Sequence, residues 1–158
     1  MLRWFLSLSA CRKVPLVLGP GMLTLAIDAF IPHWSWNNNS MKWNQYPPVI
    51  YGVLGFLALM AGALLSMPHK RRILINQIVG VGGMIVGLAG IYFHGRAIFD
   101  EIDGEEMAIK VIGKIMKDAP PLFAPAAFAG IGLLLLTLHR LTKEHTHEHG
   151  HGHPHTAG

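Results

Sequence analysis

The hydrophobic residues of this chain are gathered into four long blocks instead of being spaced at helical or strand period. The blocks cover residues 14–31, 48–67, 73–92 and 121–138, and none of them contains a lysine or an arginine. A helix rises about 1.5 Å per residue, so each block spans, or nearly spans, about 30 Å of hydrocarbon. The pattern predicts an all-α integral membrane protein, a four-helix bundle whose four transmembrane helices form two antiparallel hairpins.

The segments outside the blocks divide the chain into three parts. Residues 1–13 combine basic and aromatic side chains in a way typical of an interfacial segment, and residues 14–139 make up the transmembrane domain. Residues 140–158 form a polar, His-rich tail that we expect to be disordered. Apolar positions between 105 and 117 recur at helical spacing, which predicts a short amphipathic helix on the membrane surface.

Glycines recur along one face of each of the two middle blocks. The two sets are Gly52, Gly55 and Gly62, and Gly80, Gly83, Gly87 and Gly90. In lipid no hydrophobic force draws helices together, so association relies on small residues that let two backbones approach. We therefore predict that the second and third helices form a tightly packed antiparallel pair in which the two glycine faces meet.

The composition agrees with a chain that faces lipid. Hydrophobic residues make up 51% of the sequence and charged residues 14%, against roughly 25% charged residues in soluble domains. The net charge of +4 is scattered at block ends, so a nucleic-acid partner is not expected. Eight lysines and arginines fall on the side of both termini and five on the other. This bias predicts a multi-pass protein of a cell membrane, the bacterial inner membrane by preference, with both termini cytoplasmic.

The C-terminal tail carries histidine at alternate positions. These residues are His145, His147, His149, His151, His153 and His155. In an extended chain the alternation places the imidazoles on one side, and histidine is the commonest ligand for transition metals. The tail is therefore a candidate site for zinc, nickel or copper, with a solvated, partly charged tail as the alternative.

A second group of candidate residues lies on the opposite side of the membrane. Asp28 is the only acid inside a block, and an ionisable group there is costly enough to indicate function. His33 and His94 follow the first and third blocks, at equivalent positions if the two halves form a parallel internal repeat. Together with Arg96 they would suit a metal ion, a haem held between two imidazoles, or a quinone headgroup. Ordinary interfacial histidines and an ion pair between Asp28 and Arg96 are the alternatives.

The sequence contains no phosphate-binding glycine loop, zinc-protease helix or catalytic triad. We therefore expect a small non-enzymatic membrane protein, and three hypotheses stay open. The first is transition-metal binding or handling through the tail, which has the most specific signal. The second is a redox membrane protein that binds haem or quinone at His33 and His94. The third is an accessory subunit that packs against a membrane-protein partner or against copies of itself.

Overall fold

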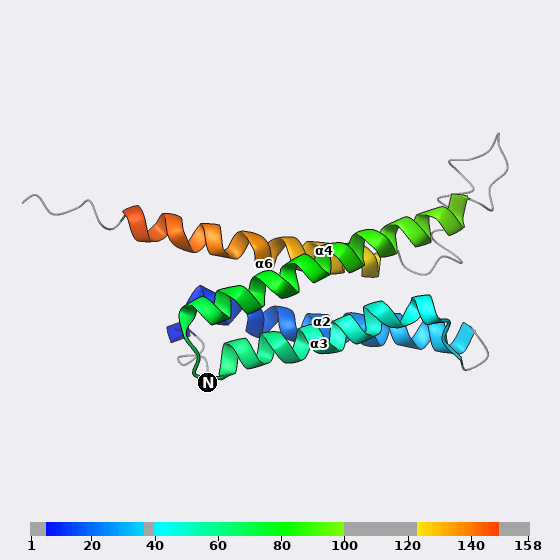
Figure 1. The fold of residues 1–158 in the computed structure, drawn as a ribbon, viewed down its shortest axis with the longest axis horizontal. Coiled ribbons are helices and arrows are strands. Elements are labelled where there is room, and N and C mark those ends of the chain that lie inside the picture. Colours follow the sequence, from blue (N-terminus) through cyan, green and yellow to red (C-terminus); the bar gives the residue numbers. More distant parts are fainter. Residues whose placement is uncertain (1–5, 37–39, 100–122, 149–158) are drawn as a thin grey trace, which may run out of the picture.

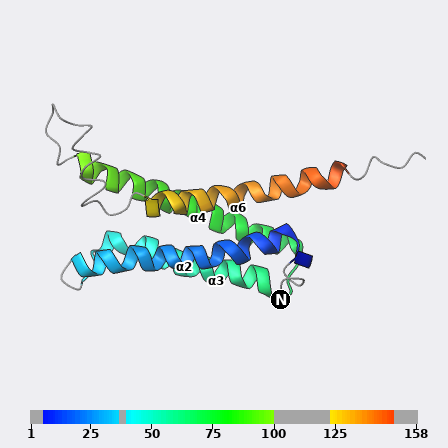
Figure 2. The same ribbon diagram turned by 180° about the vertical axis from the view of Figure 1, so that it is seen from behind.

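The computed structural model describes residues 6–36, 40–99 and 123–148 of the chain. Within them it contains four long helices, one short 3-10 helix and no strand. The helices are α2 (Ala10–Trp36), η1 (Trp43–Gln45), α3 (Tyr46–Leu64), α4 (His69–Phe99) and α6 (Phe123–Glu148). The four long helices run along one axis, with α2 beside α3 and α4 beside α6 (Figure 1 and Figure 2). The surface helix predicted at 105–117 lies outside the described residues.

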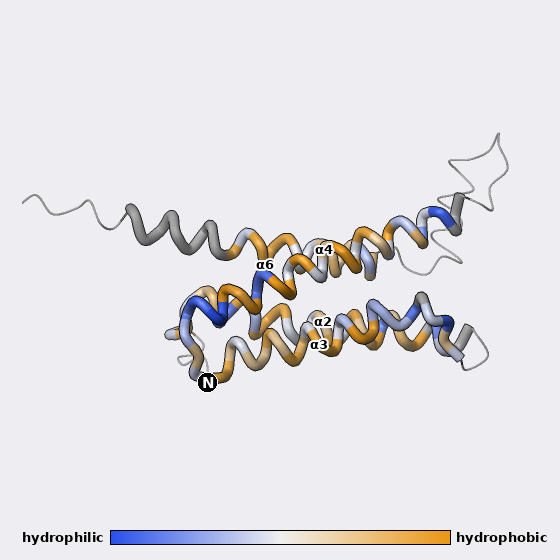
Figure 3. Tube along the Cα trace, in the orientation of Figure 1, coloured by the Kyte–Doolittle hydropathy of each residue, from blue (hydrophilic) through white to orange (hydrophobic). Residues whose placement is uncertain are grey.

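Three of these helices are long and apolar enough to cross a membrane. The spans are Ala10–Ile31, Tyr46–Leu64 and His69–Arg96. The apolar part of α6, Phe123–Leu138, is shorter. Hydrophobic positions fill the middle of the bundle and hydrophilic ones gather toward its ends (Figure 3). The predicted class, an all-helical membrane protein, is confirmed to this extent.

The outer surface of the bundle is apolar. On α4, Ile78 and Ile85 are each 63% exposed. The core between the helices is small and consists of Met22, Leu59, Val79, Phe128 and Leu135. Large apolar side chains that point away from such a core suit a solvent of lipid chains, in which they need no cover.

α2 begins four residues before the first predicted block. Its first turn is closed by the Ser9 carbonyl, which accepts hydrogen bonds from the backbone N–H groups of Arg12 and Lys13, both at 2.9 Å. Cys11 lies in this turn and is only 2% exposed. These three residues, which we had assigned to a separate interfacial segment, therefore belong to the first long helix.

α6 ends later than the sequence pattern predicted. The helix continues through 140–148, a stretch that we expected to be disordered. No glycine or proline interrupts these residues, and leucine, lysine, arginine and glutamate all favour helix. Residues two apart in a helix lie on different faces. The one-sided arrangement of histidines expected for an extended chain therefore does not apply to positions 145 and 147, which are in α6. The other tail histidines lie outside the described residues.

The glycines of α4 lie at a helix contact, but the contact is mainly with α6, and at Gly83 also with Tyr51 of α3. A Cβ atom added at Gly87 would lie 2.5 Å from the backbone nitrogen of Ala129 and 2.6 Å from the carbonyl oxygen of Pro125. One added at Gly83 would lie 2.9 Å from the Phe128 carbonyl oxygen. The two backbones are therefore so close that there is no room for a side chain between them.

The glycines of α3 pack mainly against α2. A Cβ atom added at Gly52 would lie 2.7 Å from Ala26 Cβ and 2.9 Å from the Met22 carbonyl oxygen. Gly62 does face α4, but at ordinary van der Waals distance, 3.7 Å from Ile75. The prediction that glycines mark helix contacts is thus confirmed, whereas the prediction that the two glycine faces meet each other is wrong. Each face closes its own hairpin.

Two polar side chains link the hairpins. The Tyr51 hydroxyl of α3 donates a hydrogen bond to the Val79 carbonyl of α4, and its ring meets Phe128 of α6 edge to face at 5.8 Å. At the turn between α3 and α4, Arg72 donates from Nε to the Gly62 carbonyl at 2.8 Å and from Nη2 to the Met67 carbonyl at 2.9 Å. Arg72 therefore caps the Gly62 carbonyl in the last turn of α3, and it also holds the Met67 carbonyl in the turn that follows.

Candidate functional site

His33 and His94 lie on the inner faces of their helices. On α2 the buried face includes Ala26, and His33 follows it by seven residues; on α4 it includes Gly87, and His94 follows that by seven. Seven residues are about two helical turns, so each histidine continues the side of its helix that faces the bundle.

The two imidazoles are neighbours in the structure. Their ring centroids lie 6.1 Å apart, with an angle of 61° between the ring planes, and both residues are partly buried. Burial, and secondly the charge of His94, lower the pKa of His33 below its usual value of 6.5. Removal from water disfavours the imidazolium form, and a second cation beside it does the same. The neutral ring, which is the form that binds metals, is therefore favoured at His33.

With one nitrogen of each ring turned toward the other, the centroid separation would be short enough for both imidazoles to bind one metal ion. Metal–nitrogen bonds of about 2.1 Å separate two bound nitrogens by at most about 4.2 Å, and each ring centre lies about 1.1 Å further back, which sets a limit of roughly 6.4 Å. The observed 6.1 Å falls inside this limit. A bent arrangement at a tetrahedral ion needs a closer approach, of about 5 Å. Small side-chain rotations at the two helix ends would provide it.

Asp28 and Arg96 occupy different faces from the histidines. Asp28 follows the buried Ala26 by two residues and Arg96 follows His94 by two, and both side chains are exposed. Residues two apart lie on nearly opposite sides of a helix. The structure therefore brings His33 and His94 together and leaves the other two predicted site residues on the outer surface.

Aromatic side chains mark the level of the histidine pair. Phe30 and Trp34 stack on α2 with centroids 5.6 Å apart, and Tyr92 and Phe93 are in contact on α4 at 5.5 Å. Aromatic rings with polar groups gather at membrane interfaces. His33 thus lies just beyond the first span, which ends at Ile31, and His94 lies two residues before the end of the span His69–Arg96.

For a metal ion, the pair would supply two protein ligands. Among the residues that the structure describes, no group of three or more histidine, cysteine, aspartate or glutamate side chains gathers in a way that could hold a metal ion. An ion bound by His33 and His94 would therefore complete its coordination with water or with groups from the remainder of the chain. Such a site is open, in contrast to the closed four-ligand sites that stabilise folds.

The features above define a class: a multi-pass helical membrane protein in which two histidines meet at one end of the bundle. Comparison with protein-family models, with curated proteins and with solved structures finds no match to this chain. Function must therefore be argued from the residues themselves.

Proposed function

We propose that this chain is a membrane protein that binds a transition-metal ion, zinc, nickel or copper, with His33 and His94 as ligands. The observation that carries the proposal is the 6.1 Å separation of two imidazoles contributed by different hairpins. The lowered pKa of His33 adds support because metal binding needs the neutral ring. An ion at this position would also join α2 to α4, and so would hold the two hairpins together.

We also propose a second metal site, in the tail, and an orientation of the protein in the membrane. The tail histidines, 145 to 155, would collect the same class of ion at the opposite end of the protein. We propose α6 as the fourth crossing, and the excess of basic residues supports a cytoplasmic position for both termini. The pair would then face the outer side and the tail the inner side.

Zinc titration by calorimetry separates the two sites. Truncation after Lys143 removes all six tail histidines, and the shortened protein should still bind zinc through the pair. In that background, His33→Ala or His94→Ala should weaken binding by about 100-fold or more, because loss of even a supporting group of a metal ligand costs about 10–100-fold. His69→Ala is the matched control, since His69 is an exposed histidine at the start of α4. Equal affinity in all three variants would refute the pair as a site.

The pH dependence gives an independent criterion. An imidazole with the reference pKa of ~6.5 becomes protonated and releases zinc between about pH 7 and pH 5.5, and we expect the tail to release zinc in this range. His33 has a lowered pKa, so its imidazole stays neutral to lower pH and the pair should retain zinc after the tail has released it. Release from the truncated protein at higher pH than from the tail would contradict this assignment.

An absorbance spectrum of the purified protein tests for haem between the same two residues.

A further inference from the structure

Within each hairpin, the two helices touch backbone to backbone. A Cβ atom added at Gly52 of α3 would lie 2.9 Å from the Met22 carbonyl oxygen of α2. One added at Gly132 of α6 would lie 2.6 Å from the Gly80 carbonyl oxygen of α4. Close approach of two backbones is what stabilises helix pairs in lipid, so each hairpin should behave as one unit.

Between the hairpins, side chains make the contact. A Cβ atom added at Gly55 of α3 would lie 3.6 Å from the Val79 side chain of α4, which is ordinary van der Waals distance. The Tyr51 ring covers Gly82 of α4, where an added Cβ atom would lie 2.5 Å from the Cε2 atom of the ring. Packed helices move past one another by small adjustments of such side chains. The contact between the hairpins is therefore easier to change than the contact inside either of them.

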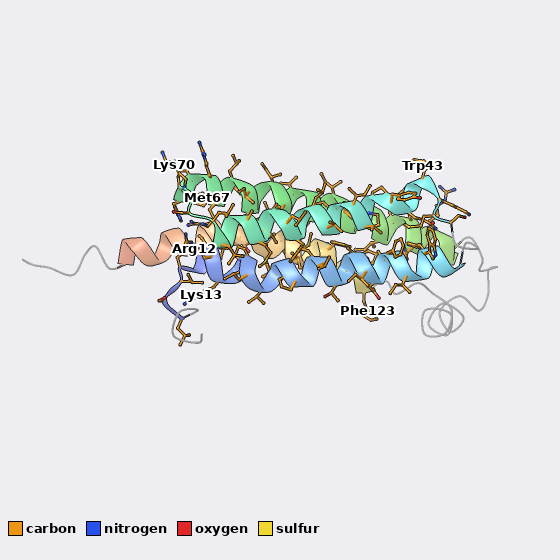
Figure 4. All side chains as sticks on the ribbon, turned by 90° about the horizontal axis from the view of Figure 1, so that it is seen from below. Arg12, Lys13, Trp43, Met67, Lys70 and Phe123 are labelled. Carbon is orange, nitrogen blue, oxygen red and sulfur yellow. The ribbon has the colours of Figure 1, made fainter. Side chains whose placement is uncertain are left out.

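The hairpins are connected at one end of the bundle. In the part of the chain that the structure describes, the connection between them is the turn at residues 65–68, between α3 and α4. Arg72 fastens this turn with hydrogen bonds to two backbone carbonyls. Figure 4 shows Met67 and Lys70 at this end and Trp43 at the other. Trp43 belongs to the connection between α2 and α3, which lies inside one hairpin, so the described chain does not tie the hairpins together at that end.

The histidine pair lies at the end that the turn does not tie. His33 is three residues before Trp36, the last residue of α2. His94 follows Arg72 by 22 residues, about 33 Å along α4. Over this length a tilt of about 2° about the turn moves the far end by about 1 Å. That is the difference between the observed ring separation of 6.1 Å and the ~5 Å that a tetrahedral ion needs.

We propose that an ion at His33 and His94 closes the two hairpins against each other about the turn between α3 and α4. This inference rests on the metal site proposed above. When the hairpins are apart, the ion reaches one of its two protein ligands, and loss of a ligand weakens binding by about 100-fold. A ligand shifts a conformational equilibrium by the ratio of its affinities for the two states. A saturating ion should therefore raise the ratio of closed to open protein by about 100-fold.

The test measures distances between spin labels on the full chain in detergent, with and without zinc. Cys11→Ala first removes the native thiol, and labels are then attached at Ile27→Cys on α2 and Leu88→Cys on α4. Both side chains are exposed, and each precedes one histidine of the pair by six residues. Zinc should shorten the mean distance by about 1 Å or more and narrow its distribution. His33→Ala, made in the same labelled protein, should abolish both effects.

Two further label pairs are the matched controls, and all of their positions are exposed. Ile27→Cys with Ile50→Cys reports on the hairpin of α2 and α3, whose distance should not change. Val17→Cys with Leu74→Cys spans the two hairpins near the turn, where a tilt about that turn moves little. Equal shortening of all three distances would show general tightening of the bundle and overturns the proposal.

Calorimetry on the same proteins separates failure of the closure from failure of the site. Zinc binding that depends on His33 and His94, with an unchanged distance between the labels at 27 and 88, overturns the closure and leaves the metal site standing. Zinc binding that His33→Ala and His94→Ala do not weaken overturns both. If His33→Ala does not fold, His94→Ala takes its place, because it removes the ligand from the other hairpin.

Discussion

Because the backbones of α4 and α6 lie so close together at Gly87, we expect Gly87→Ala to lower the stability of the protein by an amount that can be estimated. The new Cβ atom would lie 2.5 Å from Ala129 N and 2.6 Å from the Pro125 carbonyl oxygen. Both atoms belong to the backbone, so no rotamer change can remove the overlap and the two helices must separate. Gly130→Ala is the matched control, because a Cβ atom there meets nothing within 4 Å. Both substitutions gain about 0.8–1.0 kcal/mol of helix propensity.

That shared gain cancels when the two variants are compared. The difference between them isolates the cost of forcing extra volume into a packed contact, roughly 1–3 kcal/mol. For a chain of this size it corresponds to a difference of about 2–12 °C in unfolding temperature, measured in one detergent. Adding Ala129→Gly to Gly87→Ala removes the Cβ contact at 2.8 Å but leaves both backbone contacts, so it should rescue only part of the loss. If Gly87→Ala is as stable as Gly130→Ala, the close approach of α4 and α6 is refuted.

Three further predictions test the turn, the link between hairpins and the orientation. Arg72→Gln should lower the free energy of unfolding by about 2–4 kcal/mol, because two hydrogen bonds to backbone carbonyls are lost. The same substitution at the exposed Arg71 should have little effect, and equal effects would contradict the capping role of Arg72. Tyr51→Phe should cost only about 0.6–1 kcal/mol, as interhelical hydrogen bonds in membranes do, and a larger loss would point to a wider network. A reporter fused at Ser40 should behave as external, and cytoplasmic behaviour would reverse the proposed orientation.

The glycine pattern shows what a membrane sequence can and cannot specify. Glycines at helical spacing require that another backbone lie close, because nothing else compensates for the missing side chain in lipid, and the structure confirms that contact at Gly52 and Gly87. The pattern does not say which helix approaches. The partner is decided by small residues on the other helices, Ala26 on α2 and Ala129 on α6. These are ordinary alanines among many and carry no periodic signal.

The sequence alone predicted that His33 and His94 lie at the same end of the protein, but it did not show that Asp28 and Arg96 lie on other faces. The similarity of the two halves places His33 and His94 at equivalent ends, and the structure brings their rings to 6.1 Å. Asp28 and Arg96 are close to them along the chain but lie on exposed faces. Counting in steps of seven from Ala26 would have selected His33 and excluded Asp28. That count requires knowledge of which face is buried, and hydrophobicity does not reveal it in a helix that is apolar on all sides.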